Sequence, residues 1–82
     1  MKYELVDLRQ RHIEALGEIV GTHSDASNAH KFRRMVIETA IESGWFKEKP
    51  EGDVLDWIPG DVLEVSNLIF EAYTQAISVP PA

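Results

Sequence analysis

The feature that most constrains this chain is an apolar segment near its end that opens at a proline and keeps helical spacing to residue 77. Pro59 is preorganised for the first turn of a helix, where it loses no hydrogen bond. The apolar residues then recur at intervals of three and four: Val62, Val65, Ile69, Ala72 and Ala76, flanked by Leu63, Phe70, Tyr73 and Ile77. This apolar face is wider than one small core requires on one side. Burial of the whole face within the domain is the preferred interpretation, and contact of its surplus part with a partner is the alternative.

Two earlier segments share this helical spacing. The first follows Asp7, a residue suited to the N-cap, and is expected to run from about Leu8 to Val20, with Gly21 as its stop. The second follows a polar loop and is expected to end near Ser43, before a stop at Gly44. The candidates for its N-cap are Asp25, Ser27 and Asn28. An apolar residue directly after such a glycine usually folds back on the last turn, which predicts that position for Trp45.

The pattern as a whole predicts an all-α, three-helix domain over residues 1–78 with a loose tail at 79–82. Residues 3–7 alternate apolar with polar side chains, which is typical of a short N-terminal strand or an extended arm. Residues 54–58 are short, apolar and strand-like or extended. The length of 82 residues allows one domain and one core.

The residues needed for catalysis or metal binding are missing or badly spaced. The chain has no cysteine, so it has no disulfide, no cysteine nucleophile and no ordinary zinc-finger ligand set. His23, Asp25 and His30 match no zinc spacing, and surface or capping roles explain the histidines better. The acid pairs Asp53 with Asp56 and Asp61 with Glu64 are explained by capping and solubility. We therefore expect no enzyme activity, no cofactor and no metal.

Charge is divided unevenly along the chain, whose net charge is −6. From Pro50 onward there are acidic residues and no Lys or Arg, so this part should repel nucleic acid and anionic lipid and could attract a basic protein surface. Lys31, Arg33 and Arg34 form a small basic cluster, expected to pair with that acidic segment or to touch an acidic partner. No apolar run approaches the roughly 20 residues of a membrane span, and the N-terminal residues do not resemble a signal peptide. These features predict a cytoplasmic protein that binds neither membrane nor nucleic acid.

The predicted partner-binding surface combines the last helix with the loop before it. Tryptophan is enriched at binding hot spots, and we expect one tryptophan to be buried and the other partly exposed. The surplus apolar face could pack on a partner helix or on its own copy in a homodimer, whereas the acids could instead enter a basic groove. The residues assigned to this surface are Trp45, Trp57, Asp56, Asp61, Leu63, Glu64, Phe70 and Ile77.

One arrangement of residues resembles a known family. It consists of Arg33-Arg34, Ala40-Ile41-Glu42-Ser43-Gly44-Trp45-Phe46, Pro50-Glu51, Val54, Asp56-Trp57 and Pro59, followed by Val62, Ile69, Ala72 and Tyr73. Over roughly residues 31–80 this pattern is similar to the tail assembly chaperones of tailed bacteriophages. The resemblance implies a non-enzymatic protein without cofactor that binds tape-measure or tail-tube proteins during virion assembly in the host bacterial cytoplasm. The departures from the pattern are Pro59-Gly60 at the helix start and Ser66-Asn67 within the helix. The family has no catalytic signature, so no site residue is carried over.

Two other classes remain open on the sequence. One is a small acidic phage-encoded inhibitor of a host defence system, anti-CRISPR-like or a nucleic-acid mimic, whose acids would block a basic groove. The other is a host regulator or toxin–antitoxin partner that docks through the last helix. An acidic stripe continuous in space would favour the inhibitor, and an exposed apolar groove would favour the chaperone.

Overall fold

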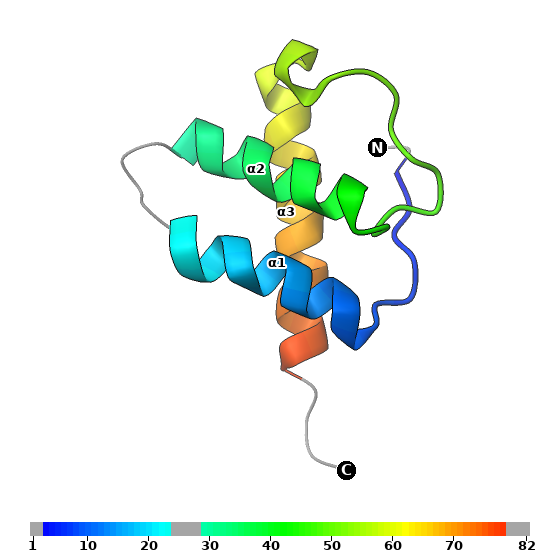
Figure 1. The fold of residues 1–82 in the computed structure, drawn as a ribbon. Helices are drawn as coiled ribbons and strands as arrows, with labels where there is room; N and C mark the ends of the chain where they lie inside the picture. The colour runs from blue at the N-terminus through cyan, green and yellow to red at the C-terminus, as the bar shows by residue number, and fades with distance from the viewer. Residues whose placement is uncertain (1–2, 24–28, 79–82) are drawn as a thin grey trace.

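Three α-helices make up most of the part of the chain that the computed structural model describes, residues 3–23 and 29–78. They are α1 (Gln10–His23), α2 (Ala29–Glu42) and α3 (Pro59–Ile77), with the short 3-10 helix η2 (Val54–Asp56) before α3. Helices α1 and α2 lie side by side and antiparallel, and α3 crosses behind both of them (Figure 1). Within the described residues there is no strand, so the predicted all-α, three-helix fold is confirmed.

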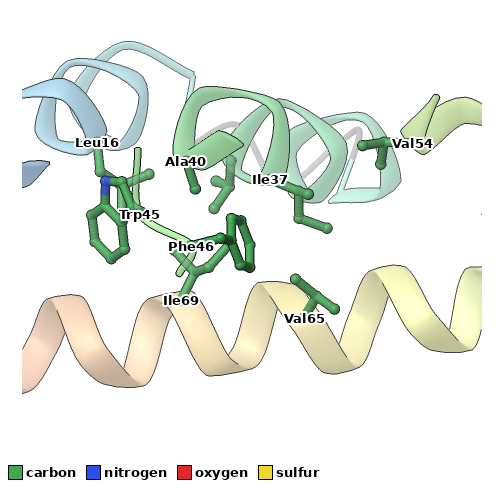
Figure 2. Packing of buried hydrophobic residues seen from close by; sticks show 9 residues of the cluster. Leu16, Ile37, Ala40, Trp45, Phe46, Val54, Val65 and Ile69 are labelled. Atoms are coloured by element: carbon green, nitrogen blue, oxygen red, sulfur yellow. The ribbon is translucent and has the colours of Figure 1, made fainter. Parts of the chain in front are cut away.

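The hydrophobic core lies where α3 crosses the other two helices. All three helices contribute to it, together with the segment that follows α2 and with η2 (Figure 2). Trp45 is the largest of its fully buried side chains. The buried apolar residues are Leu16, Val36, Ile37, Ala40, Trp45, Phe46, Val54, Val65 and Ile69. One continuous core therefore fixes the crossing of the helices and, with it, the surface around η2.

Helix α1 begins at Gln10, so the prediction of Asp7 as its N-cap and Leu8 as its first residue is wrong. The reason is an interaction made by His12. Its Nδ1 accepts a hydrogen bond of 2.8 Å from the backbone N–H of Arg9, the residue just before the helix. A side chain at the third helical position that reaches back in this way is one half of a capping box. The capping role expected of a histidine is thus filled by His12, which is buried rather than on the surface.

The end of α1 also differs from the prediction. The helix continues through Gly21 to His23, so Gly21 is an ordinary helical residue and not the stop. Its φ is not positive, and a Cβ there would meet no atom within 4 Å. The proposed N-cap residues of α2, Asp25, Ser27 and Asn28, lie outside the described residues, as does the tail at 79–82.

The end of α2 follows the prediction closely. Gly44 has φ +78°, the left-handed conformation that glycine adopts readily. The N–H of Trp45 donates to the carbonyl of Ala40 at 2.9 Å, and the N–H of Gly44 donates to that of Ile41 at 3.3 Å. These two bonds define a Schellman motif, which satisfies carbonyls at the helix end and turns the chain back. Trp45 thereby folds back on α2 as predicted, and its side chain lies in the core.

The N-terminal residues form an extended arm and not a strand. Leu5 makes a single antiparallel bridge to Phe46, with Val6 N–H donating to the Trp45 carbonyl at 2.8 Å and Lys47 N–H to the Glu4 carbonyl at 2.9 Å. Lys47 Nζ also lies 3.3 Å from Glu4 Oε2, an exposed pair that adds little stability. The arm is therefore attached to the segment after α2 rather than to α1, which follows it in sequence.

The segment before α3 contains a 3-10 turn where an extended or strand-like segment was expected. Asp53 Oδ1 accepts a hydrogen bond of 3.0 Å from Leu55 N–H, which caps the turn Val54–Asp56. Such local bonds let an aspartate compete with extended structure. The turn buries Val54 and leaves Leu55 exposed. Pro59 then begins α3 as predicted.

We predict that acid destabilises this protein through His12. Burial, more than the charges of Arg11 and Arg9, lowers the pKa of His12 below its ordinary value of 6.5, although a hydrogen bond to the Gly44 backbone opposes the shift. Because the unfolded chain then binds the proton more readily, the stabilising contribution is complete above about pH 6.5 and is lost as pH falls through the lowered pKa. Protonated Nδ1 also cannot accept the Arg9 N–H.

The measurement is urea unfolding of the wild-type protein and of His12→Gln between pH 8 and pH 5. Glutamine can reach back to Arg9 as in a capping box but does not titrate, so the variant should lose less stability on acidification than the wild type. Equal losses in the two proteins would show that His12 does not carry the effect.

Candidate functional site

A surface groove lies between the first half of α2 and the segment that carries η2 and the start of α3. It has a volume of about 420 Å³. One side is formed by polar residues of α2 and the other by apolar residues that surround the turn from η2 into α3. The lining residues are His30, Lys31, Arg34, Leu55, Trp57, Pro59 and Val62, and we call this set the groove.

The groove is lined by one of the most exposed large apolar residues of the described chain, and another follows it three positions later. Leu55, which lines it, is 65% exposed, and Ile58, between Trp57 and Pro59 in the sequence, is 70% exposed. A small domain gains free energy by burying such side chains, at about 25 cal/mol per Å², so leaving two of them close together in solvent is unfavourable for the isolated chain. Clustered exposure of this kind marks interaction surfaces.

Trp57 links the groove to the N-terminal arm. Its ring stacks on that of Tyr3 at a centroid distance of 5.7 Å with an angle of 4° between the planes, and Tyr3 meets Phe46 edge-on at 5.9 Å. Trp57 is half-buried and Trp45 fully buried, which confirms the expectation of one buried and one partly exposed tryptophan. Because the stack holds the indole in place, Trp57 can offer groove surface without first losing rotamer freedom.

Trp45 is wrong as a predicted partner-binding residue. Its side chain has no exposed area, because the Schellman motif directs it into the core beside His12. The only described buried side-chain polar atom without a hydrogen-bond partner is its Nε1, so the indole N–H also has no link to the surface. Its role is packing.

The predicted apolar stripe on α3 is not one continuous surface. Leu63 is 43% exposed and Ile77 is 56% exposed, but they are fourteen positions apart along the helix, a distance of about 21 Å. Between them Phe70 is half-buried and stacks on Phe32 of α2 at 5.7 Å. Phe70 therefore supports the α2–α3 crossing, and neither Leu63, Phe70 nor Ile77 lines the groove.

The predicted acidic residues of this region are all exposed. Asp56 lies between Leu55 and Trp57 in the sequence. Asp61 and Glu64 lie in the first two turns of α3. None of the three lines the groove. Ser66 and Asn67, the polar pair within α3, separate in the structure: Ser66 is buried and its hydroxyl donates to the Leu63 carbonyl at 2.9 Å, while Asn67 is exposed.

Several groove residues were missed at the level of sequence. Leu55 was interpreted as part of the extended segment 54–58. In an extended segment the alternation of side chains gives no reason to expect Leu55 in particular at the surface. The signal that could have found it is Asp53, which caps a turn and so sends consecutive apolar side chains to different environments. Lys31 and Arg34 were recognised as a basic cluster, but only the fold brings them beside Leu55 and Val62.

The groove differs in charge from two other hollows on the described surface. None of the described residues that line it is acidic. Its polar lining residues are His30, Lys31 and Arg34, all from α2. The other two hollows contain acids, namely Glu48 and Glu51 in one, and Glu38, Glu42 and Asp53 in the other. Arg34 pairs with Glu38 of its own helix at 3.1 Å, where an acid of the C-terminal segment was an expected alternative. A chain rich in acids thus has a groove with a basic α2 wall.

Neither a metal centre nor a membrane span is found in the described chain. No group of three or more side chains from 3–21 and 29–78 has the arrangement needed to hold a metal ion. Of the residues weighed as ligands, Asp25 and the side chain of His23 lie outside the described part of the chain. None of the three helices combines the length and apolarity that crossing a bilayer requires.

The fold and the groove define a three-helix domain with an apolar, basic-walled surface groove. Comparison with protein-family models, with curated proteins and with solved structures finds no match for this chain.

Proposed function

We propose that this chain is a non-enzymatic protein-binding module that serves as a tail assembly chaperone of a tailed bacteriophage and binds tape-measure or tail-tube protein during virion assembly. The groove is its docking surface. The phage assignment rests on the sequence resemblance over residues 31–80, and the protein-binding role rests on the exposed apolar residues of the groove.

The observation that supports the binding role is the exposure of Leu55 beside Trp57 in the groove. A chaperone for assembly must cover apolar surface of an unassembled partner, and an exposed apolar groove provides the complementary surface. The groove is held by rigid parts, since α2, η2 and α3 all pack on the core. Such rigidity lowers the entropic cost of binding.

The test of the proposal is co-expression with the tape-measure protein and the tail-tube subunit of the phage that encodes this chain. We expect at least one of them to co-purify with the wild-type chain at a fixed ratio. Leu55→Ser should reduce the recovered partner at least tenfold, which corresponds to about 1.4 kcal/mol. Because Leu55 is largely exposed, its replacement should leave the melting temperature nearly unchanged.

The matched control is Ile77→Ser, which removes a similarly exposed apolar side chain at the far end of α3. It should retain the partner. If neither phage protein co-purifies with the wild-type chain, the chaperone assignment fails. If Ile77→Ser loses the partner and Leu55→Ser retains it, the docking surface lies on α3 and not in the groove.

A second candidate is the acidic inhibitor of a host defence system. It is favoured by one observation: every acid from Glu51 to Glu71 is exposed, and no Lys or Arg occurs in that part of the chain. An inhibitor of this kind would bind a basic groove through charge, so its affinity would fall steeply with salt, whereas affinity from apolar burial would not. The salt dependence of the captured complex separates the two functions.

A further inference from the structure

We propose that the segment bound in the groove is an acidic amphipathic one, with apolar side chains against Leu55 and Trp57 and carboxylates against the α2 wall. This inference rests on the proposed protein-binding function and adds the chemical class of the partner. It follows from how the two walls of the groove differ.

The first wall requires an apolar occupant. Leu55, Trp57, Pro59 and Val62 form it, and they offer hydrocarbon and an aromatic ring but no side-chain carboxylate or amide. Displacing water from such a surface is favourable only when apolar atoms replace it. A polar strand of nucleic acid would match the Trp57 ring alone. A segment with apolar side chains on one face matches the whole wall.

The second wall selects the charge of that occupant. Lys31 and Arg34 lie on α2 with His30, and the described lining contains no acid. Arg34 already contacts Glu38 at 3.1 Å, and Lys31 also has an interaction within the chain. The guanidinium and the ammonium group each have several N–H donors, so both can serve a further carboxylate. A basic residue of a partner placed here would meet like charge at short range, which is unfavourable. The wall therefore favours carboxylates and disfavours ammonium and guanidinium groups.

The net charge of the whole chain disfavours nucleic acid and anionic membranes as occupants of the groove. The net charge of −6 repels the phosphates of nucleic acid and of an anionic membrane, each of which extends well beyond the groove and would meet the exposed acids. A short segment can be accommodated by the groove, whose described lining contains no acid. A second copy of this chain would have to insert an acidic segment such as its own Asp61–Glu64 turn, and that occupant is one outcome of the test.

The experiment uses three fluorescein-labelled model peptides that differ in one property. All carry leucines at helical positions i, i+3, i+4 and i+7, and the residues along one edge are Glu, Gln or Lys. Binding to the full chain is followed by fluorescence anisotropy at low and high salt, with the peptides far below the protein concentration. We expect the Glu peptide to bind at least tenfold more tightly than the Lys peptide at low salt, and the difference to shrink at high salt.

Two pairs of charge changes assign the preference to the groove. In Lys31→Glu with Arg34→Glu the preference should reverse in favour of the Lys peptide. The matched control is Arg11→Glu with Lys49→Glu, which changes the net charge equally on exposed residues outside the groove. The control should keep the preference for the Glu peptide. If the first pair lowers the melting temperature because the new carboxylate on α2 repels that of Glu38, Lys31→Gln with Arg34→Gln should abolish the preference without reversing it.

Each other outcome overturns the inference. Equal binding of the three peptides, sensitive to Leu55→Ser, would leave the docking groove intact and remove its charge selectivity. A preference that survives both groove variants would place the peptide elsewhere. If no peptide binds and analytical ultracentrifugation shows a dimer that forms through the groove, the occupant is a second copy of this chain. If no peptide binds and a single-stranded oligonucleotide does, the occupant is nucleic acid.

Discussion

Replacing Trp45 with alanine is expected to lower the free energy of unfolding by about 3–5 kcal/mol, the usual cost of removing a large buried aromatic side chain. Trp45 is completely buried and meets the His12 ring in a T-shaped arrangement at a centroid distance of 6.2 Å. A domain of this size has a total stability of roughly 5–10 kcal/mol, so the variant should be largely unfolded well below the wild-type melting temperature. Urea unfolding followed by far-UV circular dichroism measures the loss.

Two companion variants separate packing from polar effects. Trp45→Phe removes the indole N–H, which has no partner, along with part of the ring, so it should cost clearly less than Trp45→Ala. Trp57→Ala removes a half-buried ring and should also cost less, while weakening groove binding. A Trp45→Ala protein as stable as the Trp57→Ala protein would mean that Trp45 is not the centre of the core.

Replacing Gly44 with alanine is expected to destabilise the protein by about 1–2 kcal/mol, because a side chain is unfavourable in the left-handed region. Gly44 has φ +78°, and its N–H and that of Trp45 close the Schellman motif that ends α2. A Cβ at Gly44 would meet no atom within 4 Å, so the cost arises from the backbone and not from crowding. Thermal melting of the variant gives the change.

Gly21→Ala is the matched control, with the opposite sign. Gly21 also has room for a Cβ, but it lies within α1 and its φ is not positive. Alanine there should raise stability by about 0.5–1 kcal/mol through helix propensity. Destabilisation by Gly21→Ala would mean that α1 ends near this residue, as the sequence first indicated, and that the helix does not continue to His23.

The elements that the sequence predicted well are those set by local chemistry. The stop at Gly44, the return of Trp45 to the core and the start of α3 at Pro59 each follow from one residue type with a strong backbone preference. The start of α1 was missed because Asp7 is the stronger N-cap by residue type, whereas the interaction that forms there involves the buried ring of His12, held by a contact to Gly44 far along the chain. No local pattern contains that contact.

The candidate site was predicted less well for a related reason. Trp57 was identified from its residue type, and it does line the groove. Leu63, Phe70 and Ile77 were grouped from a helical wheel, which shows angle but not the distance along the axis or the neighbour on α2 that covers Phe70. The groove itself needs the loop before η2 to return over α2, and sequence periodicity does not define the path of such a loop.

The attachment of the arm has a consequence for the order in which this chain can be assembled on the ribosome. Glu4 and Lys47, which pair in the folded protein, are 43 positions apart, and the Tyr3 ring needs Trp57 for its stack. Tyr3 and Glu4 therefore lack these native partners until the segment after α2 and Trp57 have been synthesised. Closing so long a loop late in folding makes the arm the part expected to detach first in native-state fluctuations, and with it the support behind Trp57.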